Sequence, residues 1–437
     1  TLIDGNRVAE RIGDGTRNYI DLSFLRGVEI VKGPGSLLWG SDAMGGVVAY
    51  DTVDPGDILA PGETFGGEAT ARWGSLDNSF NETLIVAGRA EELEILAGYS
   101  RWDGEEVNLT KGRNSGGIWG DCPRDTEATP CDELDPQDYS SDSVIGKLVW
   151  NGDVHTVSLT GEFYRQHTAV EQNSVTNSLS GTSTILDYDH EQDLTRWRVS
   201  LEHDWQADWL LFDNVDWQVT YQPHEVERSG DRLIETSGGD LVLRHQLRSY
   251  SEDFIDFDAQ FDKDLVLAES VSTGLTYGID GSYTMGSYDA FDRTENLTTG
   301  VVTEAPTPGF AEADTLRLDG FALAEFGFFE DRLIFSPGVR YSYTRISPEP
   351  QEGYSSAPGL EPVESTYSDW LLAASLLYKV TDEISVYTGY SEGFKTPTAQ
   401  QLYTSSIGST FALIPNPDLK PESVWSVEAG ARAVYDD

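Results

Sequence analysis

Cysteine is almost absent from this sequence of 437 residues, which contains only Cys122 and Cys131. No histidine lies near either of them, and a structural zinc site needs four soft ligands, so zinc binding is the weaker interpretation. The segment that joins them is rich in turn-forming residues. A disulfide that closes this loop is the preferred interpretation, and it indicates an oxidising compartment such as the periplasm or the cell surface.

Positive charge is also scarce. The 29 Lys and Arg stand against 75 Asp and Glu, which gives a net charge of −46. Because clustered cations supply the affinity for phosphate backbones, this balance excludes a nucleic-acid binder. Aromatic residues make up 11% of the chain, which is too many for a disordered acidic protein. The chain is therefore expected to fold.

Long hydrophobic runs are missing as well. No stretch of about 18 apolar residues occurs, so a helical membrane span is excluded, whereas a spanning β-strand needs only about 10 residues of alternating polarity. The sequence has no signal peptide and begins at Thr1 rather than Met, so we expect its N-terminus to be missing. Without internal repeats or linkers, one large architecture is the simplest interpretation.

What the sequence does contain is a series of hairpins. The strongest one crosses Asn151-Gly152, because Asn-Gly is a strong signal for a tight hairpin turn. Four hairpins are predicted: 144–150 with 154–164, 84–89 with 93–102, 321–329 with 333–343, and 371–380 with 384–390. Long polar segments separate these hairpins: 104–141, 166–192, 228–242, 286–315, 346–366 and 395–421. Tight turns on one side and long loops on the other are typical of an outer-membrane β-barrel.

Alternating polarity favours this barrel over a large soluble jelly roll or propeller, the alternative that remains. In residues 195–205, Trp197, Val199 and Leu201 share one face with His203 and Trp205, and Arg196, Arg198 and Ser200 share the other with Glu202 and Asp204. Several strands are long enough to cross the hydrocarbon at a tilt, with aromatic residues near their ends. We predict an all-β chain with about 14 antiparallel barrel strands.

Residues 1–62 do not follow this hairpin pattern. Val28 to Val31 is predicted to be a buried strand, Ser36 to Trp39 a short helix ended by Gly40, and Gly45-Gly46 a bend. The density of glycine fits a small domain packed inside a larger structure.

The segment 21–58 resembles the end of the plug domain of TonB-dependent outer-membrane receptors, and its continuation 49–58 resembles the haem and haemoglobin receptor branch. The matching plug positions are Arg26, Glu29, Lys32, Gly33, Pro34, Gly40, Gly45 and Gly46. The first arginine of the family motif falls at Gly27, next to Arg26, and Lys32 replaces the second. Since lysine cannot make the bidentate contact of arginine, this departure implies a rewired attachment of the plug.

A second block, 390–403 followed by 415–422, is similar to the paired motifs that flank the ligand-contacting loop of the same branch. The resemblance assigns ligand binding to Phe394, Lys395, Pro397, Tyr403 and Asn416, with Tyr403 as the candidate iron ligand or else a structural residue.

Histidine is the usual haem ligand of this branch, but this sequence lacks it at both positions where the branch usually has one. The loop 398–415 contains no histidine, and the plug position where the branch often has one falls near Asp14. His155 and His203 are expected to be ordinary strand residues. His167, His190, His224 and His245 are expected near loop edges, where they could reach a ligand.

The resemblance implies active import of haem or haemoprotein-derived iron through the outer membrane of a Gram-negative bacterium. The transported ligand would be haem or a ferric chelate, with no intrinsic cofactor, and the partners would be the TonB–ExbB–ExbD energising complex, outer-membrane lipid and an extracellular haemoprotein. A ferric siderophore receptor and a non-transporting surface receptor or adhesin remain as alternatives. No catalytic motif occurs, so no enzyme is expected.

The resemblance also divides the chain. It assigns residues 1–62 to the C-terminal part of a plug and residues 63–437 to a barrel. Because receptors of this kind close with about 22 strands, C-terminal strands and the energy-coupling segment are expected to be missing.

Overall fold

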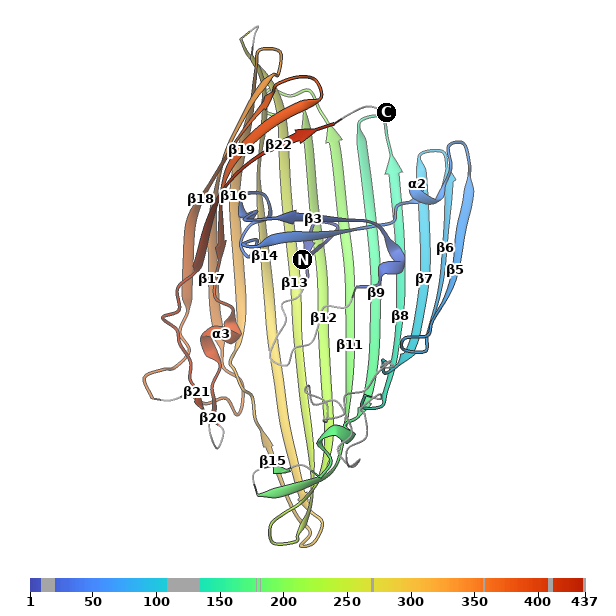
Figure 1. Cartoon of the computed structure of the whole chain (residues 1–437), viewed down its shortest axis with the longest axis vertical. Helices are drawn as coiled ribbons and strands as arrows, with labels where there is room; N and C mark the ends of the chain where they lie inside the picture. Colours follow the sequence, from blue (N-terminus) through green and yellow to red (C-terminus); the bar gives the residue numbers. More distant parts are fainter. Residues whose placement is uncertain are drawn as a thin grey trace.

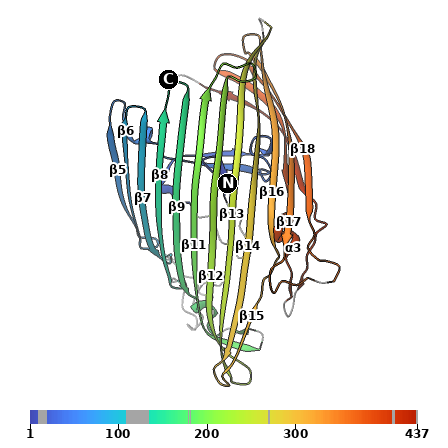
Figure 2. The same cartoon turned by 180° about the vertical axis from the view of Figure 1, so that it is seen from behind.

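The computed structural model describes residues 1–8, 20–107, 134–177, 179–180, 182–268, 271–356, 358–407 and 412–434. One strongly curved antiparallel sheet forms most of the molecule, and a small second sheet lies across its concave side (Figure 1). Seen from behind, the long strands form a continuous outer wall (Figure 2). The predicted all-β architecture with a plug and a barrel wall is therefore confirmed.

The wall contains a path of fourteen neighbouring strands in the part of the chain that the structure describes, in the order β22-β19-β18-β17-β16-β14-β13-β12-β11-β9-β8-β7-β6-β5. In chain order these strands are β5 (Phe65–Gly74), β6 (Ser79–Ala90), β7 (Leu93–Glu105), β8 (Gln137–Asn151), β9 (His155–Glu171), β11 (Ser183–Gln206), β12 (Asn214–Glu235), β13 (Leu241–Ala268), β14 (Val271–Asn296), β16 (Glu312–Phe328), β17 (Leu333–Glu349), β18 (Ser365–Lys379), β19 (Ile384–Lys395) and β22 (Glu422–Ala433). All four predicted hairpins are present, as β8–β9, β6–β7, β16–β17 and β18–β19. The count of about 14 strands is confirmed, and β5 and β22 stand at the two ends of this order.

The predicted alternation is confirmed and has the polarity of a membrane barrel. On β11, Trp197 and Val199 are 52% and 51% exposed, whereas Arg198 is 1% exposed. Apolar side chains therefore cover the outer surface of the wall, and polar ones point into the lumen. A soluble sandwich would show the opposite arrangement.

Several segments expected to be loops continue the strands instead. The four central strands β11, β12, β13 and β14 have 24, 22, 28 and 26 residues. The segment 228–242 is a hairpin with a short turn, so the prediction of a long loop there is wrong, and much of 166–192 and 286–315 is also strand. Alternation fades there because both faces meet water beyond the hydrocarbon, yet the ladder of hydrogen bonds continues.

The small sheet is the plug and has the order β2-β1-β4-β3. It consists of β1 (Leu2–Ile3), β2 (Asn6–Arg7), β3 (Leu25–Lys32) and β4 (Gly46–Thr52), accompanied by η1 (Leu22–Phe24), α1 (Ser36–Trp39) and α2 (Pro55–Ile58). The short helix at Ser36 is confirmed. The expected burial of Val28 to Val31 is wrong, because β3 is the edge strand of this sheet and Ile30 is 64% exposed.

A small apolar cluster joins the plug to the wall. Phe24 and Val53 of the plug pack against Ile85, Leu96 and Ile145 of β6, β7 and β8. Gly98 makes room for the Phe24 ring, because a Cβ there would lie 2.8 Å from Phe24 Cε1. Leu37 of the plug makes a further apolar contact near Gly338 of β17, since a Cβ there would lie 2.5 Å from Leu37 Cδ2.

At the end of the wall opposite the tight turns lie the remaining short elements. They are η2 (Asn173–Val175), β10 (Leu179–Ser180), β15 (Val301–Pro306), α3 (Ala399–Tyr403), β20 (Ser406–Ile407) and β21 (Ala412–Leu413). Cys122 and Cys131 lie outside the described residues, so their disulfide stays a prediction. Within the described ranges, no helix is long and apolar enough to cross a membrane.

Candidate functional site

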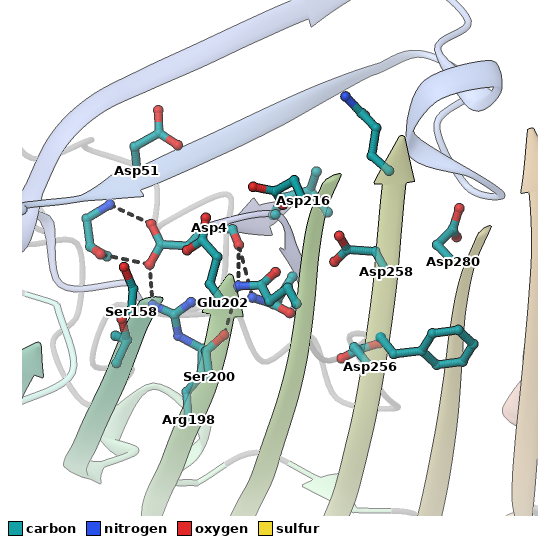
Figure 3. A pocket seen from close by; sticks show the side chains of 18 of the residues that line it. Asp4, Asp51, Ser158, Arg198, Ser200, Glu202, Asp216, Asp256, Asp258 and Asp280 are labelled. Atoms are coloured by element: carbon teal, nitrogen blue, oxygen red, sulfur yellow. Dashed lines mark hydrogen bonds and ion pairs between the residues drawn. The ribbon is translucent and has the colours of Figure 1, made fainter. Parts of the chain in front are cut away.

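A cavity of about 700 Å³ separates the plug from the wall at the level of β1 and β2. Its walls come from the plug and from β7, β8, β9, β11, β12, β13, β14 and β16. In Figure 3, the carboxylates on the wall strands face the plug across this cavity: Glu202, Asp216, Asp256, Asp258 and Asp280. The wall is thus acidic at this level, and four barrel cations within it hold the plug: Lys147, Arg198, Arg317 and Arg340.

Arg198 on β11 is the first of these cations. Its guanidinium donates to the plug carboxylate of Asp4 and to the carbonyl oxygen of Ile3 at 3.3 Å. Glu162 on the neighbouring strand β9 accepts from Arg198 Nη2 at 2.7 Å and from Nε at 3.0 Å. Alternation along β11 turns Arg198 inward, and Glu162 fixes its orientation toward the plug.

Arg340 on β17 forms a similar node and is 0% exposed. It donates to Asp319 from Nε at 2.9 Å, to Asp280, and to the plug carbonyl of Leu37 at 3.2 Å. Gly40 lies directly against this node, since a Cβ there would stand 2.9 Å from Arg340 Nη2. The glycine of the plug motif therefore allows the plug to approach a buried guanidinium.

Two further ion pairs complete the attachment. Lys147 on β8 donates to Asp54 of the plug at 2.7 Å, and Asp54 also pairs with Arg26 at 2.5 Å. Asp42 accepts from Arg7 of the plug at 2.8 Å and lies 3.6 Å from Arg317 on β16. In each case a plug carboxylate meets a barrel cation.

Two of the plug carboxylates, Asp4 and Asp42, are held in their ionised form. Burial alone pushes the pKa of Asp4 upward, but Arg198, Lys147 and the hydrogen bond from Thr52 outweigh it, so the pKa lies below its usual value. Burial acts in the same direction on Asp42, and Arg317 and Arg7 lower its pKa overall. Charged hydrogen bonds thus stabilise the docked plug.

The residues of the plug motif have two kinds of role. Its glycines allow turns and close backbone approaches, and its charged side chains lie on the surface of the plug. Gly33 and Gly46 take left-handed φ angles of 93° and 147°, and a Cβ at Gly46 would approach Val31 O to 2.4 Å. Pro34 lies close to Gly393, since a Cβ built there would be 3.2 Å from Pro34 Cβ. Glu29 and Lys32 are exposed.

The expected rewiring around this motif stays a prediction, but the structure gives the partner of Arg26. Arg26 pairs within the plug, through Asp54, rather than with a barrel acid. The barrel instead supplies the cation of this contact, Lys147.

The residues assigned to ligand binding lie near the base of the loop after β19. Phe394 is 2% exposed, and its backbone N–H donates to plug Ser36 Oγ at 3.2 Å, while its carbonyl accepts from Asp42 N at 2.8 Å. Lys395 is half-buried at the end of β19, Pro397 is buried and Asn416 is exposed. The first motif therefore connects the loop directly to the plug. The assignment of these residues to ligand binding stays a prediction.

Tyr403 sits inside the cluster that supports this loop. It is 0% exposed, packs with Leu402, Ala311 and Ile346, and donates its hydroxyl to Val363 O at 2.7 Å. Burial raises the pKa of the Tyr403 hydroxyl, which opposes the phenolate that an iron ligand requires. Of its two expected roles, this geometry favours the structural one.

All six histidines lie in strands of the wall, because these strands extend beyond the hydrocarbon. The expectation that His167, His190, His224 and His245 lie at loop edges is therefore wrong. His155 and His203 are strand residues as expected, with His155 Nδ1 3.1 Å from His203 Nε2. Among the described residues, no group of three or more His, Cys, Asp or Glu is placed to hold a metal ion.

Sequence analysis did not identify the barrel cations that hold the plug. A usable signal was present, since cations are rare in this chain and Arg198 occupies an inward position of an alternating strand. Its partner Asp4 lies 194 residues away, so the ion pair between Arg198 and Asp4 could not be predicted from the sequence.

Comparisons with known proteins agree with this geometry. Residues 133–437 match the family model "TonB dependent receptor-like, beta-barrel", and residues 1–47 match "TonB-dependent Receptor Plug Domain". The chain is 24% identical to a hemin receptor of Yersinia enterocolitica, over 100% of this chain and 56% of that protein. It is 25% identical to hemoglobin-haptoglobin utilization protein B of Neisseria meningitidis serogroup C, over 95% of this chain and 55% of that protein.

Among solved structures, the fold is similar to a double mutant of the Serratia marcescens hemophore receptor HasR in complex with its hemophore HasA and heme. The TM-score is 0.67 at 19% identity, over 98% of this chain and 61% of that one. The chain spans about half the length of the curated relatives it matches. From the wall, the plug and these matches, we conclude that the chain belongs to the TonB-dependent receptor family.

Proposed function

We propose that this chain is part of a receptor for active uptake of haem, or of haemoprotein-derived iron, across the outer membrane of a Gram-negative bacterium. The observation that carries the proposal is the similarity to a hemin receptor over 100% of the chain, plug and wall together. The second relative, a hemoglobin-haptoglobin utilization protein, is similar over 95% of the chain.

The attachment of the plug fits an energised transporter. Ion pairs and hydrogen bonds at Arg198, Arg340 and Lys147 hold the plug, next to one small apolar cluster. Polar contacts exchange with water at a modest net cost, so a pulling partner can release them step by step. We assign this pulling role to the TonB–ExbB–ExbD complex.

We place ligand recognition at the long loops and divide the chain near residue 62. The plug sheet ends at Thr52 and the first wall strand begins at Phe65, which supports a plug segment 1–62 and a wall segment 63–437. Phe394 joins the loop after β19 to the plug through Ser36 and Asp42. A ligand seated on this loop would therefore act on the plug through few intervening contacts.

The test uses the full-length receptor in an iron-starved strain that lacks its own haem receptor. We expect growth on haemin as the only iron source, and we expect it to disappear when the energising complex is deleted, while haemin binding to the cells remains. Growth on a ferric siderophore but not on haemin would favour the siderophore alternative. Binding without uptake in the energised strain would favour a surface receptor or adhesin.

A further inference from the structure

The lumen side of β12 and β13 continues beyond the plug toward the long loops. Gln222 on β12 marks the level of the plug, since its side-chain amide donates to Arg7 O at 3.2 Å. Arg228 and Arg232 lie six and ten residues further along β12 (228 − 222 and 232 − 222), so they share the inward face of Gln222. At about 3.3 Å per residue they stand roughly 20 and 33 Å beyond this level.

The strand register brings these arginines opposite two others. Arg228 is the cross-strand partner of Arg248 on β13, and Arg232 is the partner of Arg244. Like charges directly opposite one another are destabilising in an antiparallel sheet. The chain nevertheless places two such pairs on one face although it has only 29 cations against 75 acids.

The opposite face of this region carries further acids. The exposed ones are Glu225, Glu227 and Asp231 on β12 and Asp189 and Glu191 on the neighbouring strand β11. Two acids lie on the lumen face near the arginines. Asp292 pairs with Arg248 at 2.6 Å, and Glu252 lies on β13 four residues (252 − 248) from Arg248, toward the plug. The lumen face of this region thus holds the four arginines together with Asp292 and Glu252.

One of these arginines, Arg232, also lies against an aromatic ring. Arg232 lies over the ring of Tyr188 on β11, with its Cζ 4.1 Å from the ring centroid. Gly230 leaves room for this ring, because a Cβ there would be 3.1 Å from Tyr188 Cε2. Arg232 Nε and His190 Nδ1 are buried and have no hydrogen-bond partner within the described residues.

We infer that Arg228, Arg232, Arg244 and Arg248 form an anion-binding wall that receives the carboxylates of a flat aromatic ligand between the long loops and the plug. Guanidinium groups bind carboxylates through charge-assisted, often bidentate hydrogen bonds, and they stack on aromatic planes. An anion between Arg232 and Arg244 would offset the repulsion of that facing pair. This inference rests on the proposed function, because a haem carrying two carboxylates is such a ligand.

The experiment compares full-length receptor variants in detergent by titration with haemin and with haemin dimethyl ester, whose carboxylates are uncharged. The test variants are the pairs Arg228→Gln with Arg248→Gln and Arg232→Gln with Arg244→Gln. Arg165→Gln is the matched control, since Arg165 lies on β9 with its side chain 61% exposed.

We expect each pair of substitutions to weaken haemin binding about tenfold, as for the loss of one charged hydrogen-bonded contact. Binding of the ester and binding to the Arg165→Gln receptor should change less than about twofold. Unchanged haemin affinity in both paired variants would overturn the inference.

Failure of the proposed function is recognised separately. If the parent receptor binds neither haemin nor its ester, haem uptake is wrong for this protein. The same variants are then titrated with a ferric tris-catecholate, another aromatic anion. Loss of its binding in the paired variants but not in Arg165→Gln supports the wall, and equal binding overturns it.

Discussion

At the scale of single residues, the attachment of the plug depends on how closely its backbone approaches buried guanidinium groups. Gly40 has a φ of 70°, and a Cβ there would meet Arg340, Arg7 and Asp319, each at 2.9 Å. Gly45, another glycine of the same motif, would meet nothing within 4 Å. The two positions therefore form a matched pair.

We predict that Gly40→Ala destabilises the docked plug by about 1–3 kcal/mol, from backbone strain and displacement of the arginines. Gly45→Ala should cost less than about 1 kcal/mol. Limited proteolysis of the plug at increasing urea concentration measures both. Equal effects of the two substitutions would show that the contacts of Gly40 do not matter.

Arg198 provides a second test at this scale. We predict that Arg198→Ala lowers the stability of the plug by about 3–5 kcal/mol, because Glu162 and Asp4 lose their buried cation. Arg165→Ala, which breaks an exposed pair with Asp193 at 3.7 Å, should cost about 0–1 kcal/mol. Urea unfolding of the full-length receptor gives both values, and a small effect at Arg198 would contradict its role as an anchor.

The docking of the plug should also depend on pH. The pKa of Asp4 in the docked plug lies below the ordinary value of 3.8. Its ionised form therefore stabilises docking above that value, and this contribution is lost as the pH falls through the lower pKa. We predict that proteolytic protection of the plug decreases below about pH 4 and that Asp4→Asn flattens this dependence. An identical pH profile for both proteins would exclude Asp4 as a source.

At the scale of elements, the outward face of β11 changes character along the strand. Asp189, Glu191 and Asp193 are followed by Trp197, Val199 and Leu201, with a residue pointing outward at every second position. This change marks the boundary of the hydrocarbon, and it explains why strands of 22 to 28 residues are longer than a membrane requires.

We predict that Val199→Arg destabilises the receptor in lipid by about 2–4 kcal/mol, because the charge would lie near the membrane midplane. Glu191→Arg, on the same face of the same strand, should change stability by less than about 1 kcal/mol. Unfolding from liposomes in urea compares them. If Val199→Arg were as mild as Glu191→Arg, the apolar band would not face lipid.

At the scale of the whole molecule, the wall closes around the plug on one side. In the part of the chain that the structure describes, β5 and β22 each have a strand partner on one side only. Unpaired backbone groups cost several kcal/mol each in hydrocarbon. We predict that a polypeptide limited to residues 1–437 does not insert into liposomes as a folded monomer, whereas the full-length receptor does. A heat-sensitive electrophoretic shift of residues 1–437 alone, the mark of a folded barrel, would contradict this.

The hairpins, the face of each strand and the plug motif could all be predicted from the amino-acid sequence. These features depend on neighbours: Asn151-Gly152 makes a tight turn, and a period of two along β11 separates Val199 from Arg198. The length of such strands also predicted that their apolar face points outward to lipid and their polar face into the lumen.

Which residues meet across the lumen could not be predicted, because it depends on how the whole chain folds. Asp4 and Arg198 are 194 residues apart, and Arg228 faces Arg248 because of the register between β12 and β13. Tyr403 is buried and Ile30 exposed because of what packs on each, which no local pattern encodes. Contacts of this kind depend on register and on the position of the plug, so they appear only when the whole chain is folded.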